Sequence, residues 1–175
     1  LEVNALKLEI RPFDIHELCR DIFESLELKA AEKNITLSFA KDYGAIYVKG
    51  DKSKISQVLV NLLINSIFYG NVGGHAIVRF DIMDDFVNIE VSDDGPGIEP
   101  HHLSRLFERF YRVEKSRNRN EGGSGLGLAI AKHIVESHGQ SIQVKSQVGI
   151  GTTFVLTMEK SKNTGPVSSR GIPLK

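Results

Sequence analysis

At 175 residues the chain has about the size of one domain, since typical domains run to roughly 100–200 residues. With 41% hydrophobic and 25% charged residues it has the composition of an ordinary globular protein with a buried core, which excludes global disorder. Lys+Arg and Asp+Glu are both 22, so the formal net charge is zero, and the basic footprint of a nucleic-acid or anionic-membrane binder is missing. Cys19 is the one cysteine and cannot form an internal disulfide, and no run of about 20 apolar residues predicts a membrane span.

The chain begins with a mixed stretch, residues 1–13, that contains Pro12. Because a proline disfavours helix in the residue before it, we expect this stretch to be the end of a preceding element. From Asp14 the apolar side chains recur at steps of three and four residues, which predicts an amphipathic helix over 14–32 with Asp14 as its N-cap. Short strands are predicted next, over 35–40 and 45–48.

A second helix is predicted after Asp51 and ends at Gly70. One of its sides carries Gln57, Asn61, Asn65 and Phe68, which follow steps of four, four and three residues and therefore line up. The stretch is otherwise strongly apolar, so its polar side chains need a reason. Either they cap a buried backbone group or they face a ligand.

The second half of the chain alternates strands with turn-forming residues. Two alternating runs, 75–83 and 86–93, predict a hairpin that ends in a glycine-rich turn. From 108 to 123 the periodicity fails and basic residues accumulate, which predicts a long loop of the kind that covers binding sites. We expect Phe107, Phe110 and Tyr111 to anchor this loop to the core. The other predicted elements are a short helix over 100–107, a helix from the glycines at 122–127 to Gly139, strands over 141–146 and 152–159, and a disordered tail.

Four features have side chains suited to a nucleotide. The helix that follows the glycine cluster could bind phosphate through its first amides, although the cluster lacks the lysine of a P-loop and a hinge explains it equally well. Asn65 offers an amide oxygen of the kind that Mg²⁺ accepts. Asp93 can accept a hydrogen bond from an exocyclic amine such as that of adenine, whereas Asp94 suits a turn that bonds its own backbone. Arg112 could pair with a phosphate, although a run of basic residues is by itself more often a solvated surface.

Taken in chain order, five motifs resemble the N, G1, F, G2 and G3 boxes of sensor histidine kinases. They are the asparagine helix, Asp93-Asp94-Gly95-Pro96-Gly97-Ile98, Phe107-Glu108-Arg109-Phe110-Tyr111-Arg112, Gly123-Ser124-Gly125-Leu126-Gly127-Leu128 and Gly149-Ile150-Gly151-Thr152-Thr153-Phe154. The resemblance covers residues 14–158 and implies the ATP-binding catalytic domain with the Bergerat fold. That fold is α+β, a two-layer sandwich in which a mixed sheet is covered on one face by three helices. The implied organisation is a preceding dimerisation helix or linker ending in 1–13, the catalytic domain over 14–160, and a disordered tail over 161–175.

The resemblance also implies roles for individual residues. Asn65 would hold Mg²⁺ with Asn61 as its neighbour in the N box, Asp93 would bond the adenine amino group, and Arg112 would meet the γ-phosphate. Asn61, Asn65 and Arg112 are thus the implied catalytic residues. The further implied contacts with ATP are Tyr69, Gly95, Gly97, Ile98, Gly123, Ser124, Gly125, Leu126, Gly127 and Thr152.

Two positions distinguish the chain from its relatives of this fold. Phe68 stands where family members commonly have Lys or Arg, so a direct phosphate contact is missing and ATP affinity is expected to be lower. The topoisomerase, mismatch-repair and chaperone ATPases place a Glu one helical turn before the metal-binding Asn to activate water, and Asn61 stands at that position here. A site without that base favours handing the phosphoryl group to an acceptor over hydrolysis.

The implied function is transfer of the γ-phosphoryl group of ATP, with Mg²⁺, to a histidine on a dimerisation domain that is absent from this chain. The implied partners are that domain, in a homodimeric bacterial two-component sensor, and a response regulator. We expect the domain to be the cytoplasmic part of a membrane-anchored sensor, with no nucleic-acid binding and no membrane contact of its own. The alternatives are a nucleotide-binding interaction module without transfer activity and a serine kinase of the anti-sigma-factor type.

Overall fold

The computed structural model describes residues 7–113 and 125–162, and within them seven strands form one sheet. The strand order is β1-β3-β7-β5-β4-β2, and β6 pairs with β7 beside β3. Only the pair of β2 and β4 is parallel, so the sheet is mixed, as the resemblance implied. The strands are β1 (Arg11–Asp14), β2 (Thr36–Phe39), β3 (Tyr47–Gly50), β4 (His75–Ile82), β5 (Phe86–Asp93), β6 (Ile142–Gln147) and β7 (Gly151–Lys160).

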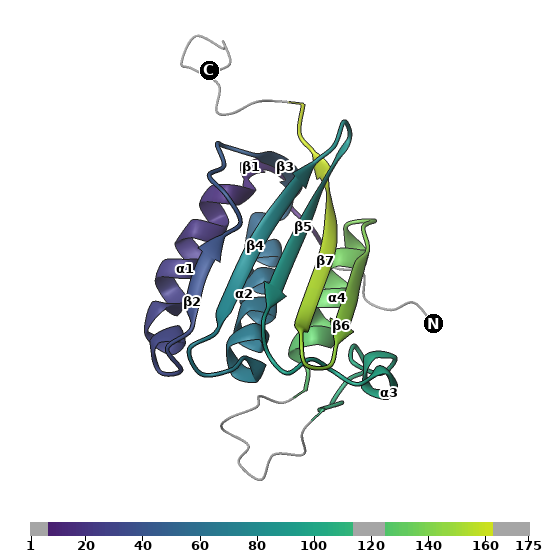
Figure 1. Cartoon of the computed structure of the whole chain (residues 1–175). Helices are drawn as coiled ribbons and strands as arrows, with labels where there is room; N and C mark the ends of the chain where they lie inside the picture. Colours follow the sequence, from purple (N-terminus) through teal and green to yellow (C-terminus); the bar gives the residue numbers. More distant parts are fainter. Residues whose placement is uncertain (1–6, 114–124, 163–175) are drawn as a thin grey trace, which may run out of the picture.

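Three longer helices, α1 (Ile15–Ala31), α2 (Lys52–Tyr69) and α4 (Gly127–Ser137), lie together against one face of the sheet (Figure 1). The central strands bury every second side chain toward these helices, because successive strand residues point to opposite faces. The opposite face carries polar pairs such as Arg79 with Glu90 and Ser92 with Thr153. The two-layer α+β architecture is therefore confirmed. The buried strand residues are Ala76, Val78, Phe80, Val87, Ile89, Val91, Phe154, Leu156 and Met158.

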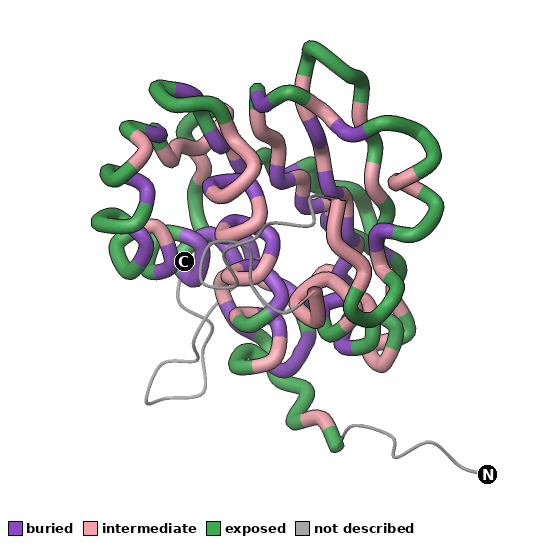
Figure 2. Tube along the Cα trace, turned by 90° about the horizontal axis from the view of Figure 1, so that it is seen from below, coloured by how far each residue is buried: buried purple, intermediate pink, exposed green. Residues whose placement is uncertain are grey.

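Helix α2 lies at the centre of the helical layer. It packs against α1, α4, β4 and β5, and its residues Ile55, Val58, Leu59, Leu62 and Leu63 are fully buried. Figure 2 shows buried residues gathered between the layers and exposed residues around the rim of the molecule. A helix that is apolar on most sides needs such surroundings. Among the described helices, none has the length and apolarity needed to cross a membrane.

Strand β1 was not expected from the sequence. Residues 11–13 were assigned to the end of a preceding element, but Arg11–Asp14 pairs antiparallel with β3, from Arg11 opposite Gly50 to Asp14 opposite Tyr47. Pro12 is compatible with this pairing because β1 is an edge strand, where a missing N–H does not break a ladder. Asp14 also caps α1 as predicted, since its Oδ1 accepts hydrogen bonds from the amides of His16 (3.0 Å) and Glu17 (3.3 Å).

The end of α2 is closed by a side chain from elsewhere in the sequence. Gly70 ends the helix as predicted, but its φ of −69° and ψ of 160° are extended, so no left-handed cap satisfies the last carbonyls. Lys33 Nζ instead donates to the carbonyl oxygens of Phe68 (2.7 Å) and Gly70 (2.6 Å). A Cβ at Gly70 would lie 2.6 Å from the Ser66 carbonyl oxygen, so glycine permits this close ending.

We expect Lys33→Met to lower the free energy of unfolding by about 1–2 kcal/mol, because two charge-assisted hydrogen bonds are lost while the aliphatic stem is kept. Urea denaturation measures the change. Lys29→Met is the matched control, since Lys29 lies on the exposed last turn of α1, and it should leave the stability within about 0.5 kcal/mol. Equal effects of the two substitutions would show that Lys33 does not cap α2.

Candidate functional site

Four element ends meet at one end of the molecule, which is the lower end in Figure 1. They are the C-terminus of α2, the end of β5, the turn between β6 and β7, and the start of α4. Helix α2 contacts both α4 and β5, and β5 pairs with β7 over its whole length. Motifs that are up to about ninety residues apart in the sequence thus lie beside one another, as the predicted site requires.

Asp93 is the last residue of β5 and lies opposite Thr152 of β7. Its Oδ1 accepts a hydrogen bond from the amide of Gly95 at 2.9 Å. Burial raises the pKa of Asp93 above its ordinary value, and hydrogen bonds from the backbones of Gly95 and Thr152 only partly oppose this. The hydroxyl of Ser66 is buried close to Asp93 but makes no hydrogen bond of ordinary geometry. A carboxylate that is poorly solvated in this way gains from a further donor, such as an amino group.

The turn after Asp93 can only be built with glycine. A Cβ at Gly95 would lie 2.9 Å from Asp93 Oδ1 and 3.0 Å from the carbonyl oxygen of Tyr69. Gly97 has a φ of +79°, and a Cβ there would lie 2.3 Å from the Gln147 carbonyl oxygen. The turn is therefore pressed between the end of α2 and the turn before β7.

Ser146 joins the two turns of the site. Its hydroxyl accepts a hydrogen bond from the amide of Ile98 (2.7 Å), donates to the carbonyl of Gly151 (3.0 Å) and shares a hydrogen bond with Thr152 Oγ1 (2.8 Å). The side chains of Ile98 and Thr152 are buried there. Ser146 was not predicted from the sequence, because a serine before a glycine turn carries no signal of its own.

Asn61 and Asn65 lie on the same side of α2, one turn apart, but have different surroundings. Asn61 Nδ2 donates to the carbonyl of Gly127 at 3.0 Å, so it satisfies a backbone group in the first turn of α4. Asn65 is half-buried and makes no side-chain hydrogen bond within the part of the chain that the structure describes. Each of the two explanations for polar residues on this helix therefore applies to a different residue. Asn61 bonds a backbone group, whereas the amide oxygen of Asn65 is available to a ligand. Across residues 7–113 and 125–162, no group of three or more His, Cys, Asp or Glu residues could hold a metal.

The start of α4 has no side-chain cap. Its N-cap residue is Leu126, and no side-chain hydrogen bond caps the helix within the described part of the chain. Gly125 has a φ of +78°, and a Cβ there would lie 2.8 Å from the carbonyl carbon of Phe110. Gly123 and Ser124, which were also predicted to contact phosphate, lie outside the described residues. A helix start of this kind presents unpaired N–H groups to an anion.

Arg112 carries an unsatisfied donor. Its Nε is buried and has no hydrogen-bond partner among residues 7–113 and 125–162. A buried donor without an acceptor costs about 1–3 kcal/mol, and a ligand oxygen would remove that cost. Arg112 is therefore compatible with the predicted phosphate contact.

The aromatic residues before Arg112 were predicted to be anchors, and only one of them is. Phe107 packs edge-on against Phe154, with 6.2 Å between ring centroids. Phe110 is 64% exposed, because its φ of 66° turns the side chain outward, so the prediction was wrong for this residue. Tyr111 contacts His102 and Arg105 instead of the core. Leu106, which was not predicted as an anchor, is the buried one.

Asp94 differs from its neighbour Asp93. Its two carboxylate oxygens accept hydrogen bonds from the amide (2.8 Å) and Nδ1 (2.9 Å) of His75 at the start of β4. Burial alone would raise the pKa of Asp94, but these hydrogen bonds outweigh it and lower the pKa. Asp94 thus stabilises the fold, whereas the charge on Asp93 is held at a cost.

We expect Asp93→Asn to raise the melting temperature of the ligand-free domain at pH 7, because the folded state holds the ionised Asp93 less readily than the unfolded state does. The gain should vanish when the pH falls below about 4, where the aspartate is protonated in both states. Calorimetry across pH 3–7 measures the difference.

Asp94→Asn is the matched control and should have the opposite sign. Because the pKa of Asp94 is lower in the folded state, its ionised carboxylate stabilises the fold at any pH above its pKa in the unfolded chain. This stabilisation is lost as the pH falls through the pKa of the folded state. Destabilisation of the ligand-free domain at pH 7 by both substitutions would contradict the assignment of Asp93.

A family model described as "Histidine kinase-, DNA gyrase B-, and HSP90-like ATPase" matches residues 50–162. The chain is 44% identical over 115 residues to sensor histidine kinase WalK of Bacillus subtilis, which covers 65% of this chain and 19% of WalK. It is 39% identical over 127 residues to sensor protein SrrB of Staphylococcus aureus, which covers 73% of this chain and 21% of SrrB. The chain thus spans about a fifth of the length of these relatives.

Solved structures show the same fold. The catalytic domain of histidine kinase ThkA superimposes with a TM-score of 0.75 at 27% identity, covering 87% of this chain and 96% of that domain. ThkA has also been solved in complex with the response regulator protein TrrA, with a TM-score of 0.73. Full-length ShkA in complex with AMPPNP gives a TM-score of 0.78 at 27% identity, covering 90% of this chain and 33% of ShkA. The chain belongs to the histidine kinase-, DNA gyrase B- and HSP90-like ATPases, and its fold is that of the ATP-binding catalytic domain of sensor histidine kinases.

Proposed function

We propose that this domain binds ATP and Mg²⁺ between α2, α4 and the ends of β5 and β7, and that it hands the γ-phosphoryl group to a histidine outside this chain. One observation carries the proposal. A buried carboxylate, an uncapped helix start and a buried arginine Nε without an acceptor all belong to the motifs that meet at one end of the sheet. The carboxylate suits an amino group on a base, and the helix start and the arginine each suit phosphate oxygens.

The base is the part of the nucleotide that Asp93 would recognise. Its carboxylate accepts the hydrogen bond of the adenine amino group and regains the solvation that burial removes. Gly95 and Gly97 shape this pocket because their backbone leaves no room for a side chain. Ile98 and Thr152, tied together through Ser146, form its buried wall, and Tyr69 lies against the nucleotide from the last turn of α2.

The phosphates are the part that α4 and Arg112 would hold. Backbone amides at Gly125, Leu126 and Gly127, continued by Gly123 and Ser124, wrap the phosphate oxygens, and Arg112 contacts the γ-phosphate. Asn65 holds Mg²⁺, which when bound neutralises charge on the phosphates. Asn61 acts by holding Gly127, and so the start of α4, beside α2.

The same residues favour transfer to an acceptor over hydrolysis. Asn61 occupies the place of a water-activating base, but a side-chain amide takes no proton, and its Nδ2 is engaged with Gly127. Phosphoryl transfer depends mostly on positioning and charge neutralisation, which this site supplies. In the proposed step the bond between the γ-phosphorus and ADP breaks as the imidazole nitrogen of the acceptor histidine bonds to phosphorus.

The proposed partners are a dimerisation domain that carries this histidine and a response regulator. The complex of ThkA with TrrA and the short span of this chain on its relatives support both. Residues 1–13 link to the dimerisation domain in this proposal, although β1 makes 11–13 part of the sheet. The domain acts on the cytoplasmic side of a sensor protein, and the proposed tail over 161–175 lies almost wholly outside the described residues.

We expect Asn65→Ala to abolish the magnesium-dependent part of ATP binding without changing the melting temperature by more than about 2 °C, because the side chain makes no hydrogen bond within the described residues. Titration calorimetry with and without Mg²⁺ measures this. Asn88→Ala is the control, since Asn88 lies on the sheet face away from the helices. An unchanged magnesium-dependent affinity in Asn65→Ala would remove Asn65 from the metal site.

The transfer itself is tested by mixing this domain with the dimerisation domain of its own full-length protein and ATP labelled at the γ-phosphate. We expect a label on that partner that is labile to acid and stable to base, as for phosphohistidine. Nucleotide binding without any label would instead indicate an interaction module, for which Phe68 is the motivating residue. An acid-stable, base-labile label would indicate a serine kinase.

A further inference from the structure

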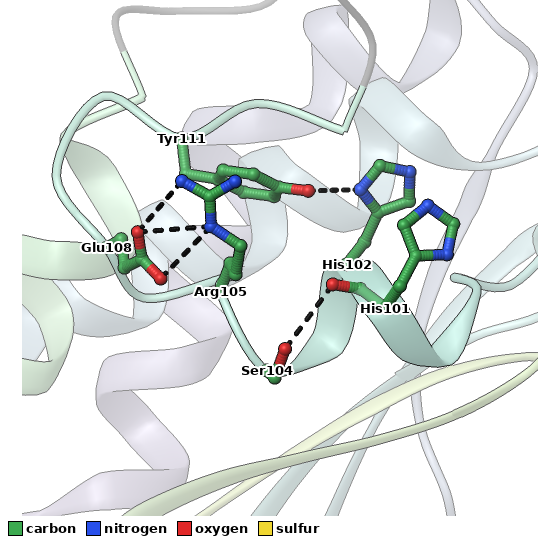
Figure 3. A network of polar contacts seen from close by, with 6 residues as sticks. All are labelled: His101, His102, Ser104, Arg105, Glu108 and Tyr111. Atoms are coloured by element: carbon green, nitrogen blue, oxygen red, sulfur yellow. Dashed lines mark hydrogen bonds and ion pairs between the residues drawn. The ribbon is translucent and has the colours of Figure 1, made fainter.

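Four side chains, one from α3 (Pro100–Leu103) and three from the residues between α3 and Arg112, form a continuous line of contacts, shown in Figure 3. Arg105 donates to both carboxylate oxygens of Glu108 at 3.2 Å. The guanidinium carbon of Arg105 lies 4.5 Å from the ring centroid of Tyr111, and the Tyr111 hydroxyl is hydrogen-bonded to His102 Nδ1. We call His102, Arg105, Glu108 and Tyr111 the Tyr111 clasp.

The clasp acts on a stretch of backbone that has little secondary structure of its own. Residues 104–113 belong to neither a helix nor a strand, so single turns, such as the hydrogen bond from the Tyr111 amide to the Glu108 carbonyl, and side-chain contacts fix their course. The ion pair of Arg105 with Glu108 is exposed and contributes little to overall stability. Its effect is directional, because it holds the guanidinium over the ring of Tyr111 while His102 holds the hydroxyl.

Arg112 follows Tyr111 directly, and the same stretch is also tied to the residues before α4. The amide of Phe110 donates to the carbonyl of Gly125 at 2.9 Å, which joins this stretch to the residues before α4. The Nε of Arg112 is buried without an acceptor among the described residues, a placement that costs free energy. Tyr111 precedes Arg112 directly, so the contacts that hold Tyr111 also hold the backbone from which the Arg112 side chain extends.

We propose that Tyr111 is a positioning residue, which His102 and Arg105 hold so that Arg112 is already directed at the phosphate subsite before nucleotide binds. The proposal rests on the proposed function. Its physical basis is that ordering a long side chain at the moment of binding weakens affinity by about two- to tenfold, a cost that prior ordering avoids.

The test compares Tyr111→Phe with wild type for binding of ATP and of ADP. The substitution removes the hydroxyl and keeps the ring against Arg105. We expect ATP affinity to fall about two- to tenfold and ADP affinity to stay the same, because Arg112 serves the terminal phosphate. Tyr43→Phe is the matched control, since the Tyr43 hydroxyl accepts a hydrogen bond from the amide of Phe80, remote from the clasp, and should leave the ATP-to-ADP ratio unchanged.

Two further variants make the test specific. His102→Leu should shift the ratio as Tyr111→Phe does, and His102→Gln, which can still bond a hydroxyl, should restore most of it. In an Arg112→Ala background, Tyr111→Phe should have no further effect on the ratio.

Equal weakening of ATP and ADP by Tyr111→Phe would overturn the positioning role, as would an additive effect in the Arg112→Ala background. If Arg112→Ala shifts the ATP-to-ADP ratio but Tyr111→Phe does not, the positioning role of Tyr111 is wrong and the proposed function still stands. If Arg112→Ala itself leaves the ratio unchanged, Tyr111 has nothing to position and the γ-phosphate role of Arg112 fails with it.

Discussion

The burial of α2 between the sheet and the two flanking helices is the constraint on which the other parts depend. Each of its fully buried aliphatic side chains contributes about 1.5–3 kcal/mol, so rotating or sliding the helix would be costly. The helix therefore presents Asn61 and Asn65 in one fixed direction. Asn61 uses that direction to hold the first turn of α4, and the uncapped amides of α4 are held beside α2 as a result.

The adjacent carboxylates of Asp93 and Asp94 divide two tasks between them. Asp94 is fully used by His75 and ties the turn to β4, while Asp93 is buried with fewer donors than it can accept. A fold selected for stability alone would supply enough hydrogen-bond donors to both carboxylates. The raised pKa of Asp93 is therefore more informative about binding than its position in the turn.

The elements that the sequence predicted well are those with strong local signals. The periodicity of α1 and α2, the Asp14 cap of α1, the start of α2 after Asp51, and the alternation in β4 and β5 were confirmed to within a few residues. Strand β1 was missed because its partner β3 is more than thirty residues away and Pro12 suggests a break. Long-range contacts were missed for the same reason.

Within the candidate site, the chemistry of single residues was predictable and their partners were not. The sequence could show that polar residues on α2 need an explanation, but only the structure separates Asn61, bonded to Gly127, from Asn65. Ser146, Lys33 and the Tyr111 clasp had no signal, because each depends on backbone or side chains that folding brings close. Phe110 was assigned to the core on its residue type alone, and its left-handed backbone places it outside.

The sheet edges have a consequence for where the folding unit begins. The family model starts at residue 50, yet the two outermost strands, β1 and β2, the helix α1 between them and all but the last residue of β3 precede it. A fragment expressed from residue 50 would lose both edges of the sheet, the helix that covers one side of α2 and the lysine that closes its end. Strands β4 and β7 would then have unpaired backbone edges, and the apolar side of α2 would be exposed, so such fragments would aggregate. We therefore expect a soluble fragment to need a start before Arg11.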